Sequence, residues 1–462
     1  MAKILVTIGA LIALMLCAAF IVPYFIDWNA YKGFIETRSR EATGQPVLID
    51  GDIAIRLLPQ PVVRAEKVRV GAQTEKNHPP LMQAEAFEAA FSIPAMLRGL
   101  WEITHVNLVN PVLHVERGGN RLDVKPQLAL EQGGKVALDN MTISNGTVIL
   151  KDERRGIDAV VPSIEAKFQA TSLTGPYRLI GTLGAAGRKF SLATGRLGED
   201  GNLRLTSQLD LALGELRLTG QADDLFGTPR FDGRVKLSGR PGPQLRYLVE
   251  SPVQWDGSLL SLPNLKSTIE SHGGQARFEG KLNVDWSARP VFNGQMQARR
   301  VDFDALTGND DKAPFDPLLL ARALSGHQSG LLPKIAGGKL KLEIRNGVAA
   351  GETFSGLKTL LEFEGGHLSG LTGNAALPGR STLFVDGRFS APDGQDQFKG
   401  QYSLKTGDLK KLLNWSGFEA ALAGRAKAVE LKLGGDLWLG AQRARFDAAG
   451  TIDKQKVSGQ FD

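Results

Sequence analysis

Residues 276–286 read Ala276-Arg277-Phe278-Glu279-Gly280-Lys281-Leu282-Asn283-Val284-Asp285-Trp286. Apolar residues or glycine alternate here with charged or polar residues. Because successive side chains of a β-strand point to opposite faces of a sheet, this pattern predicts a strand with one dry and one wet face.

The same alternation recurs on both sides of this stretch. Leu203, Leu205, Leu209, Leu211 and Leu213 alternate with mostly polar residues, and so do Leu340, Leu342 and Ile344. A five-residue unit, apolar-x-Gly-x-apolar, also recurs at Phe231–Val235, Phe278–Leu282, Phe292–Met296, Val385–Phe389, Phe398–Tyr402 and Val457–Phe461. Its irregular spacing indicates a meander of similar strands and not a fixed-period solenoid.

Glycine in this unit falls on the same face as the flanking apolar residues. Two explanations stay open: glycine thins the dry face so that the sheet bends or another group approaches closely, or it marks β-bulges. The chain has 54 Gly and 7% aromatic residues among 462, which also indicates many turns and thin strands.

We therefore predict a mainly β fold: an elongated, curled antiparallel sheet, shaped like a groove or taco, with a few short helices. The helical candidates are Pro94–Leu100, Pro243–Glu250, Phe315–Leu324 and Asp408–Trp415. They are too sparse for a series of α/β crossovers, and we expect them to cap or cover sheet edges.

A long sheet with one apolar face must bury that face against itself or a second sheet, or leave it as a groove for an apolar ligand. The alternation alone does not choose between these arrangements. If the groove exists, we expect it to be lined by Leu203, Leu205, Leu209, Leu211, Phe231, Val235, Phe278, Leu282, Val284, Leu340, Leu342 and Phe398.

The N-terminal segment from Ile4 to Val22 contains no charged residue. As a helix it would be about 30 Å long, which is the thickness of the hydrocarbon core of a bilayer. Pro23 and the aromatic residues after it suit the membrane surface. We predict a transmembrane anchor over residues 1–26 with the N-terminus inside; a cleaved signal peptide is the alternative.

Composition and motifs argue against several other functions. The net charge of +6 is spread along the chain, so no nucleic-acid partner is expected. The single cysteine, Cys17, cannot form a disulfide within the chain, and the six histidines lack metal-ligand spacing. No nucleophile elbow, P-loop or dinucleotide fingerprint is present. We predict no enzymatic activity, no cofactor and no metal site.

Several short motifs follow the apolar segment in a fixed order. They are Asp27-Trp28-Asn29, Thr43-Gly44-Gln45-Pro46-Val47-Leu48-Ile49-Asp50-Gly51, Leu57-Leu58-Pro59-Gln60-Pro61, Leu97-Arg98-Gly99-Leu100-Trp101-Glu102-Ile103, Asn110-Pro111 with Val115-Glu116, and Ile143-Ser144-Asn145-Gly146-Thr147-Val148 with Asp152. This series resembles the N-terminal signature of the AsmA-like family of Gram-negative envelope proteins. The resemblance covers roughly residues 1–185.

The resemblance implies a division into the anchor (1–26), an AsmA-like N-terminal β region (27–185) and a repetitive β body with short helical excursions (186–462). It also implies an inner-membrane, single-pass protein with a periplasmic body, related to bridge-like lipid transfer proteins. Its partners would be phospholipid, the inner membrane and outer-membrane or periplasmic proteins.

The implied function is binding or conduction of phospholipid along an apolar β-groove, in support of outer-membrane lipid homeostasis. The alternative is a non-enzymatic assembly factor that contacts outer-membrane client proteins through sheet edges. Family members usually continue beyond the length seen here, so a truncated form, an oligomer or transfer of lipid to a partner are all expected possibilities.

Overall fold

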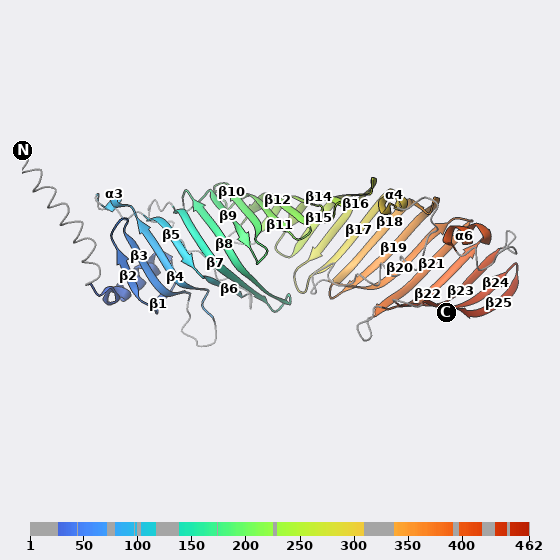
Figure 1. Cartoon of the computed structure of the whole chain (residues 1–462), viewed down its shortest axis with the longest axis horizontal. Helices are drawn as coiled ribbons and strands as arrows, with labels where there is room; N and C mark the ends of the chain where they lie inside the picture. The colour runs from blue at the N-terminus through green and yellow to red at the C-terminus, as the bar shows by residue number, and fades with distance from the viewer. Residues whose placement is uncertain are drawn as a thin grey trace, which may run out of the picture. The chain divides into compact units, whose positions relative to one another are not determined.

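The computed structural model describes residues 26–461, apart from residue 44 and residues 72–78, 97, 99–102, 117–137, 173, 225–228, 309–336, 391–396, 418–429 and 441–443. The described part is mainly β with a few short helices, as the alternating sequence predicts (Figure 1). The chain divides into two compact units. The N-terminal unit comprises Met1–Leu211 and Arg217–Pro229, and the C-terminal unit comprises Ala212–Leu216 and Arg230–Asp462.

The N-terminal unit contains a curled mixed sheet. Its strands are β1 (Val47–Ile49), β2 (Ile53–Arg56), β3 (Val62–Val70), β4 (Met82–Phe91), β5 (Ile103–Val109), β6 (Val112–Glu116), β7 (Leu138–Asp152), β8 (Ile157–Ala170), β9 (Tyr177–Leu183), β10 (Arg188–Thr194) and β11 (Leu203–Leu211). β1 and β2 both pair with β3 and so share one edge position. β5 and β6 likewise share the position between β4 and β7. From β7 to β11 each strand pairs with the next.

The break between β5 and β6 lies at Asn110-Pro111. Asn110 has a φ of 47°, in the left-handed region that asparagine tolerates better than most residues, and proline has no N–H for the ladder. The backbone pairing is nevertheless kept, because Asn110 N donates to Ser144 O (2.9 Å) and Thr147 N donates to Pro111 O (2.8 Å). The Asn-Pro motif therefore lets one strand position change direction without losing its neighbour.

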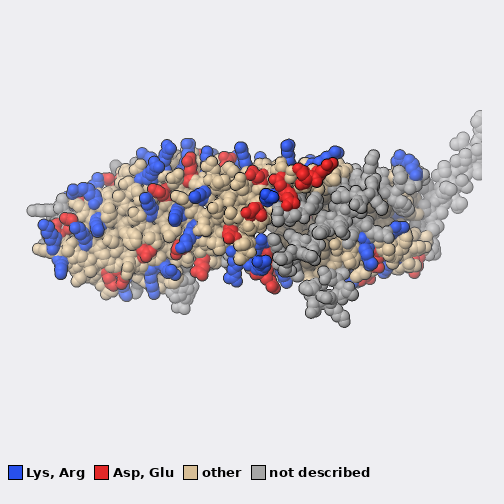
Figure 2. Space-filling view, turned by 180° about the vertical axis from the view of Figure 1, so that it is seen from behind, with Lys and Arg blue, Asp and Glu red and all other residues tan. Residues whose placement is uncertain are grey.

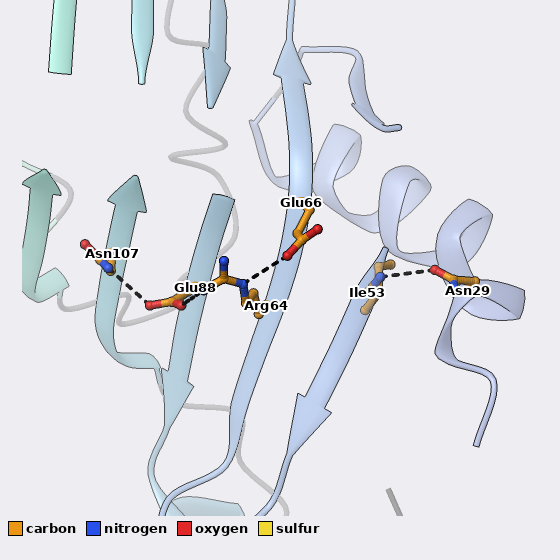
Figure 3. A network of polar contacts seen from close by, with 6 residues as sticks. All are labelled: Asn29, Ile53, Arg64, Glu66, Glu88 and Asn107. Carbon is orange, nitrogen blue, oxygen red and sulfur yellow. Dashed lines mark hydrogen bonds and ion pairs between the residues drawn. The ribbon is translucent and has the colours of Figure 1, made fainter. Parts of the chain in front are cut away.

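Short helices cover the β1/β2 edge of this sheet. The 3₁₀-helix η2 (Trp28–Tyr31) and helix α2 (Lys32–Thr43) place Trp28 and Ile35 against a buried cluster. That cluster comprises Val47, Ile49, Ile53, Ala65 and Val68. Two backbone N–H groups of the edge also find side-chain acceptors. Ile49 N donates to Glu36 Oε1 (2.8 Å), and Ile53 N donates to Asn29 Oδ1 (3.1 Å), as Figure 3 shows for the second pair.

The C-terminal unit also contains a curled sheet. Its strands are β13 (Arg230–Gly239), β14 (Arg246–Trp255), β15 (Leu259–Ser271), β16 (Gly274–Asp285), β17 (Val291–Asp302), β18 (Gly337–Ala349), β19 (Glu352–Glu364), β20 (His367–Leu377), β21 (Ser381–Ser390), β22 (Gln397–Thr406), β23 (Leu431–Leu439), β24 (Ala444–Ile452) and β25 (Gln455–Phe461). Each strand pairs with the next one along the chain. Strand β12 (Gly214–Asp223) has residues in both units.

The prediction of a purely antiparallel sheet is wrong. β5 and β6 both run parallel to β7, and β17 runs parallel to β18. A parallel pair needs a connection long enough to return the chain to the same end of the sheet. Residues 117–137 and 303–336 provide that length between β6 and β7 and between β17 and β18.

The helices confirm some of the predicted helical segments and correct others. Asp408–Trp415 is confirmed by α6 (Leu409–Ser416). Of the predicted Pro94–Leu100, the structure describes residues 94–96 and 98, and residues 94–96 lie in helix α3 (Ile93–Met96). The predicted helix at Pro243–Glu250 is wrong, because this segment enters β14. Its β-favouring residues Tyr247 and Val249 pair with strands on both sides. Phe315–Leu324 lies outside the described residues.

Within the described part of the chain, no helix has the length and apolarity needed to cross a membrane. The predicted anchor, residues 1–26, lies outside the described residues except for Ile26.

Candidate functional site

Cross-strand register in the C-terminal unit places one apolar residue or glycine after another on the same face. Directly paired residues of neighbouring strands point to the same side of a sheet. Successive pairs from β15 to β24 link Leu262, Leu282, Gly294, Leu340, Leu361, Leu371, Gly387, Gly400, Leu437 and Phe446. We call this set the apolar row, and the face that carries it the inward face.

The adjacent row, one residue along each strand, has the opposite character. It links Ser261, Asn283, Asn293, Lys339, Glu362, Gly370, Arg388, Lys399, Trp438 and Arg445. Lys339 and Glu362 form an ion pair of 2.7 Å across β18 and β19. The outward face is thus a solvated polar surface, and the wet/dry alternation of the sequence corresponds to the two faces of the sheet.

Exposure shows where the inward face is covered. From Leu262 to Leu437, every residue of the apolar row is half-buried, and Phe446 is 37% exposed. By contrast, the inward residues Ala276, Ala298 and Ile344 are only 1–3% exposed, because they pack in a cluster with residues of a helix. The residues of the apolar row are shielded in part by their neighbours along the sheet. A layer packed over the row would bury these residues as fully as the helix buries the Ala276 cluster.

Two short helices supply that local cover. Helix α4 (Phe303–Thr307) packs Phe303 and Leu306 against the Ala276 cluster. Helix α6 packs Leu412 and Trp415 against Phe354. Both helices lie at the same ends of the strands, the upper ends in Figure 1.

Polar contacts fix both helices in place. Asp302 caps α4 by accepting from Ala305 N (3.0 Å), and the buried Asp304 carboxylate accepts from Ala350 N (2.8 Å) and Gly351 N (2.9 Å) in the β18–β19 turn. On α6, Trp415 Nε1 donates to the main-chain oxygen of Ala349 at 2.7 Å. One end of the inward face is therefore closed by structure that is bonded to the sheet.

Aromatic side chains line the opposite ends of the strands on the inward face. A second row of direct pairs runs through Phe231, Trp255, Leu260, Val284, Phe292, Gly338, Phe363 and Leu368. The Phe292 and Phe363 ring centroids are 5.5 Å apart, and those of Phe389 and Phe398 are 4.9 Å apart. These contacts form an aromatic border at the end away from α4 and α6.

Some glycines of the recurring unit lie where neighbouring backbones approach closely. A Cβ atom at Gly280 would lie 1.9 Å from Gln295 O, and one at Gly400 would lie 2.2 Å from Asp386 O. Gly400 pairs directly with Gly387 in regular register. At these positions glycine permits close approach of adjacent strands, which is the first of the two explanations offered by the sequence.

The N-terminal unit repeats the same division of faces. Its pairs link Ile53, Ala65, Phe87, Leu108, Ile143, Ala166, Gly181, Phe190 and Leu209 on one side. The adjacent row links Ala54, Arg64, Glu88, Asn107, Thr142 and Lys167. Ile143 belongs to the Ile-x-Asn-Gly-x-Val motif, so this motif contributes to the apolar side.

Polar residues form a network on the outward face of this unit (Figure 3). Arg64 Nη1 contacts Glu88 Oε1 at 2.6 Å, and its Nε contacts Glu66 Oε1 at 3.4 Å. Asn107 Nδ2 donates to Glu88 Oε2 at 3.1 Å. The hydrogen bond from Asn107, followed by the one from Arg64, holds the pKa of the Glu88 carboxyl below its ordinary value. The network joins β3, β4 and β5, and we interpret it as a set of surface contacts that stabilise the sheet.

The twelve residues predicted to line a groove lie on the apolar sides of the two units. Leu203, Leu205, Leu209 and Leu211 lie on β11 of the N-terminal unit, and the other eight lie on β13, β16, β18 and β22 of the C-terminal unit. Leu282 and Leu340 both flank Gly294 in the apolar row. Phe231 (9% exposed) and Phe398 (4%) are buried, and Phe278 packs against the cluster beneath α4. These three residues contribute more to packing than to an accessible surface.

Other residues of the face were not foreseen as lining. These residues are Leu262, Leu361, Leu371, Leu437 and Phe446 of the apolar row. Leu371 lies between glycine and threonine, and alternation would have found it, whereas Leu361 and Leu437 are followed or preceded by a second apolar residue, which obscures the pattern. The aromatic border and the positions of α4 and α6 depend on strand register, which alternation alone does not give.

On the face seen in Figure 2, Lys and Arg side chains are spread over the described part of the chain, and several Asp and Glu side chains gather near the middle of the view. Among the described residues, no group of His, Cys, Asp and Glu could hold a metal ion.

The fold and its faces define a class of protein: a meandering β-sheet protein with one polar face and one apolar face. The sequence model of the AsmA family matches residues 1–344, and the chain belongs to that family. This family is not known as enzymatic. Among curated proteins and among solved structures, no match to the chain was found. The family match ends within β18, whereas the apolar row continues to β24, so the same construction extends beyond the matched residues.

Proposed function

We propose that this protein binds or conducts phospholipid along its inward face, as an inner-membrane-anchored periplasmic protein that supports outer-membrane lipid homeostasis. The observation that carries the proposal is the apolar row of the C-terminal unit. It crosses every strand from β15 to β24 with no polar side chain, and from Leu262 to Leu437 it remains half-buried.

The size of the row suits an acyl chain. Neighbouring strands lie about 4.8 Å apart, so a row across β15 to β24 extends about 40 Å. Acyl chains of one leaflet reach about 15 Å, half the thickness of the hydrocarbon core. Between two and three chain lengths (roughly 40 Å over roughly 15 Å) therefore fit in line, and each CH₂ removed from water contributes about 0.8 kcal/mol.

The asymmetry of the strand ends supports the same function. Helices α4 and α6 close one end of the inward face, and the aromatic border lies at the other. A polar headgroup placed under α4 would face the apolar cluster that includes Ala276 and Ile344, and one placed under α6 would face the apolar side chains of Phe354 and Leu412; these side chains offer it no hydrogen bonds. We therefore expect headgroups to project past the aromatic border.

The alternative is an assembly factor that adds client strands to a sheet edge, and the β1/β2 edge does not favour it. Strand addition needs free backbone groups at an edge. At the β1/β2 edge, the N–H groups of Ile49 and Ile53 are already bonded to Glu36 and Asn29. This edge is covered in the way that sheet proteins use to avoid strand addition.

The test is photocrosslinking from single positions of the full chain in its native membrane. A photoreactive amino acid is placed at inward Leu282, Leu340 or Leu361, and in matched chains at outward Lys281, Lys341 or Leu360. Phospholipid adducts, identified by mass spectrometry, are expected at the inward positions only. Equal lipid labelling of both faces, or adducts only with outer-membrane proteins, would refute lipid conduction along this face; the second result would support the alternative.

A further inference from the structure

Helix α2 exposes an aromatic and cationic stripe. Tyr31, directly before the helix, is 53% exposed, Phe34 is 64% exposed, and Arg38 lies over the Phe34 ring at 5.6 Å from its centroid. The spacing i, i+3 and i+7 places the three on one side of the helix. We call these three residues the α2 stripe.

The opposite side of the helix is held by the sheet, which fixes the direction of the stripe. Ile35 packs on the buried cluster of β1 and β2, and Glu36 Oε1 accepts the hydrogen bond from Ile49 N at 2.8 Å. Because this contact anchors the helix to the edge strand, α2 cannot rotate to bury Phe34. The stripe faces away from the sheet.

The chemistry of the stripe is that of a membrane interface. Tyrosine prefers the boundary between headgroups and acyl chains, phenylalanine can insert its apolar ring at the acyl side of that boundary, and arginine reaches headgroup phosphates while its stem stays in apolar surroundings. Lys32 and Arg40 add positive charge to the same helix, and Glu36 and Glu41 balance it, so the charge of the stripe itself is that of Arg38. A phospholipid headgroup layer, with phosphates beside apolar acyl chains, complements this set.

Chain length brings the helix close to such a surface. The apolar segment predicted to span the membrane ends at Val22, nine positions before Tyr31. Even fully extended, that distance is about 30 Å, and the η2 turn at Trp28–Tyr31 shortens it. We propose that the α2 stripe docks on the phospholipid headgroup layer of the membrane that holds the anchor. This inference rests on the anchor in the proposed function, and adds a second membrane contact made by the folded unit.

The experiment measures depth in the bilayer with the full chain in vesicles of phosphatidylcholine and phosphatidylglycerol. Cys17, the single cysteine, is replaced (Cys17→Ser), and Phe34→Cys is labelled with an environment-sensitive fluorophore. The matched control is Val160→Cys on β8 of the same unit, where the native side chain is 58% exposed. A lipid spin-labelled near its headgroup serves as the quencher.

We expect quenching at position 34 to exceed that at position 160 severalfold. Equal, weak quenching at the two positions would overturn the docking of the stripe. Labelling native Cys17, with a quencher at mid-acyl depth, reports the anchor separately. Quenching at Cys17 but not at position 34 would support the membrane anchor and refute docking of the α2 stripe. Quenching at position 34 but not at Cys17 would support docking of the stripe and refute the anchor.

Discussion

Two adjacent residues of β19 allow a stringent test of the lipid path. Leu361 is inward and pairs with Leu340 and Leu371, whereas Leu360 is outward and pairs with Lys341 and Thr372. Both side chains are half-buried. Leu361→Asp and Leu360→Asp therefore introduce the same charge on the same strand and differ only in the face that receives it.

The expected magnitude follows from the contact that is lost. Complete burial of a leucine side chain is worth about 1.5–3 kcal/mol, so removing its contact with an acyl chain costs about 2 kcal/mol. That is roughly a thirtyfold loss in affinity, since each 1.4 kcal/mol is a factor of ten. A carboxylate beside the acyl chain adds a desolvation cost, so thirtyfold is the smaller expected effect.

The assay compares phospholipid retained by each purified full chain, counted by mass spectrometry per mole of protein, and phospholipid moved between donor and acceptor vesicles. Thermal unfolding of both variants serves as the control for folding. We expect Leu361→Asp to lose retention and transfer while Leu360→Asp keeps both. Equal losses in two variants of equal stability, or none in either, would refute the assignment of lipid to the inward face.

Three further predictions test the structure of the two units. Gly400→Ala should lower the free energy of unfolding by about 1–3 kcal/mol in urea titration, because its Cβ collides with a main-chain oxygen. Gly242→Ala, with no atom within 4 Å of its Cβ, should change it by less than about 1 kcal/mol; equal effects would contradict the close approach of strands. Trp415→Ala should cost about 3–5 kcal/mol by the same titration, because a buried indole and its hydrogen bond are lost, and a cost below about 1 kcal/mol would show that α6 is not anchored as described. Glu88 has a folded-state pKa below its unfolded value, so its contribution to stability is present above the unfolded pKa of about 4.3 and is lost as pH falls through the folded pKa. Glu88→Gln should therefore reduce the acid-side slope of stability against pH, and an unchanged slope would contradict the stabilising role of Asn107.

The alternating sequence predicted much of the fold because alternation reports local geometry. The stretch that begins at Ala276 forms β16, and its apolar residues share one face, as period two requires. Alternation contains no information on strand direction, so the parallel pairing of β17 with β18 could not be predicted from it. The prediction of a helix at Pro243–Glu250 is wrong because the apolar residues of this segment fit either a short helix or a strand. Pairing with β13 and β15 on its two sides favours the strand.

The candidate site was predictable in composition and less so in arrangement. The alternation of the sequence predicts that residues such as Leu282 and Leu340 lie on the apolar face of their strands. That these two residues both lie next to Gly294 depends on the register between strands, which the alternation does not give. The cover by α4 depends on contacts between residues far apart in the sequence, such as Asp304 with Ala350. Such contacts leave no local signal beyond the capping residue Asp302.

The parallel pairing of β17 with β18 has a consequence for how the C-terminal unit folds. Most other strand contacts in this unit join neighbours in the chain through a short turn or a modest loop, so hairpins can grow by local zipping. The β17–β18 contact must instead close the chain across residues 303–336, at an entropic cost of about 3 kcal/mol, and the β22–β23 contact closes it across residues 407–430 at a similar cost. We expect β13–β17 and β18–β22 to form early as separate nuclei, and the closure of these two long connections to be the slow steps of folding.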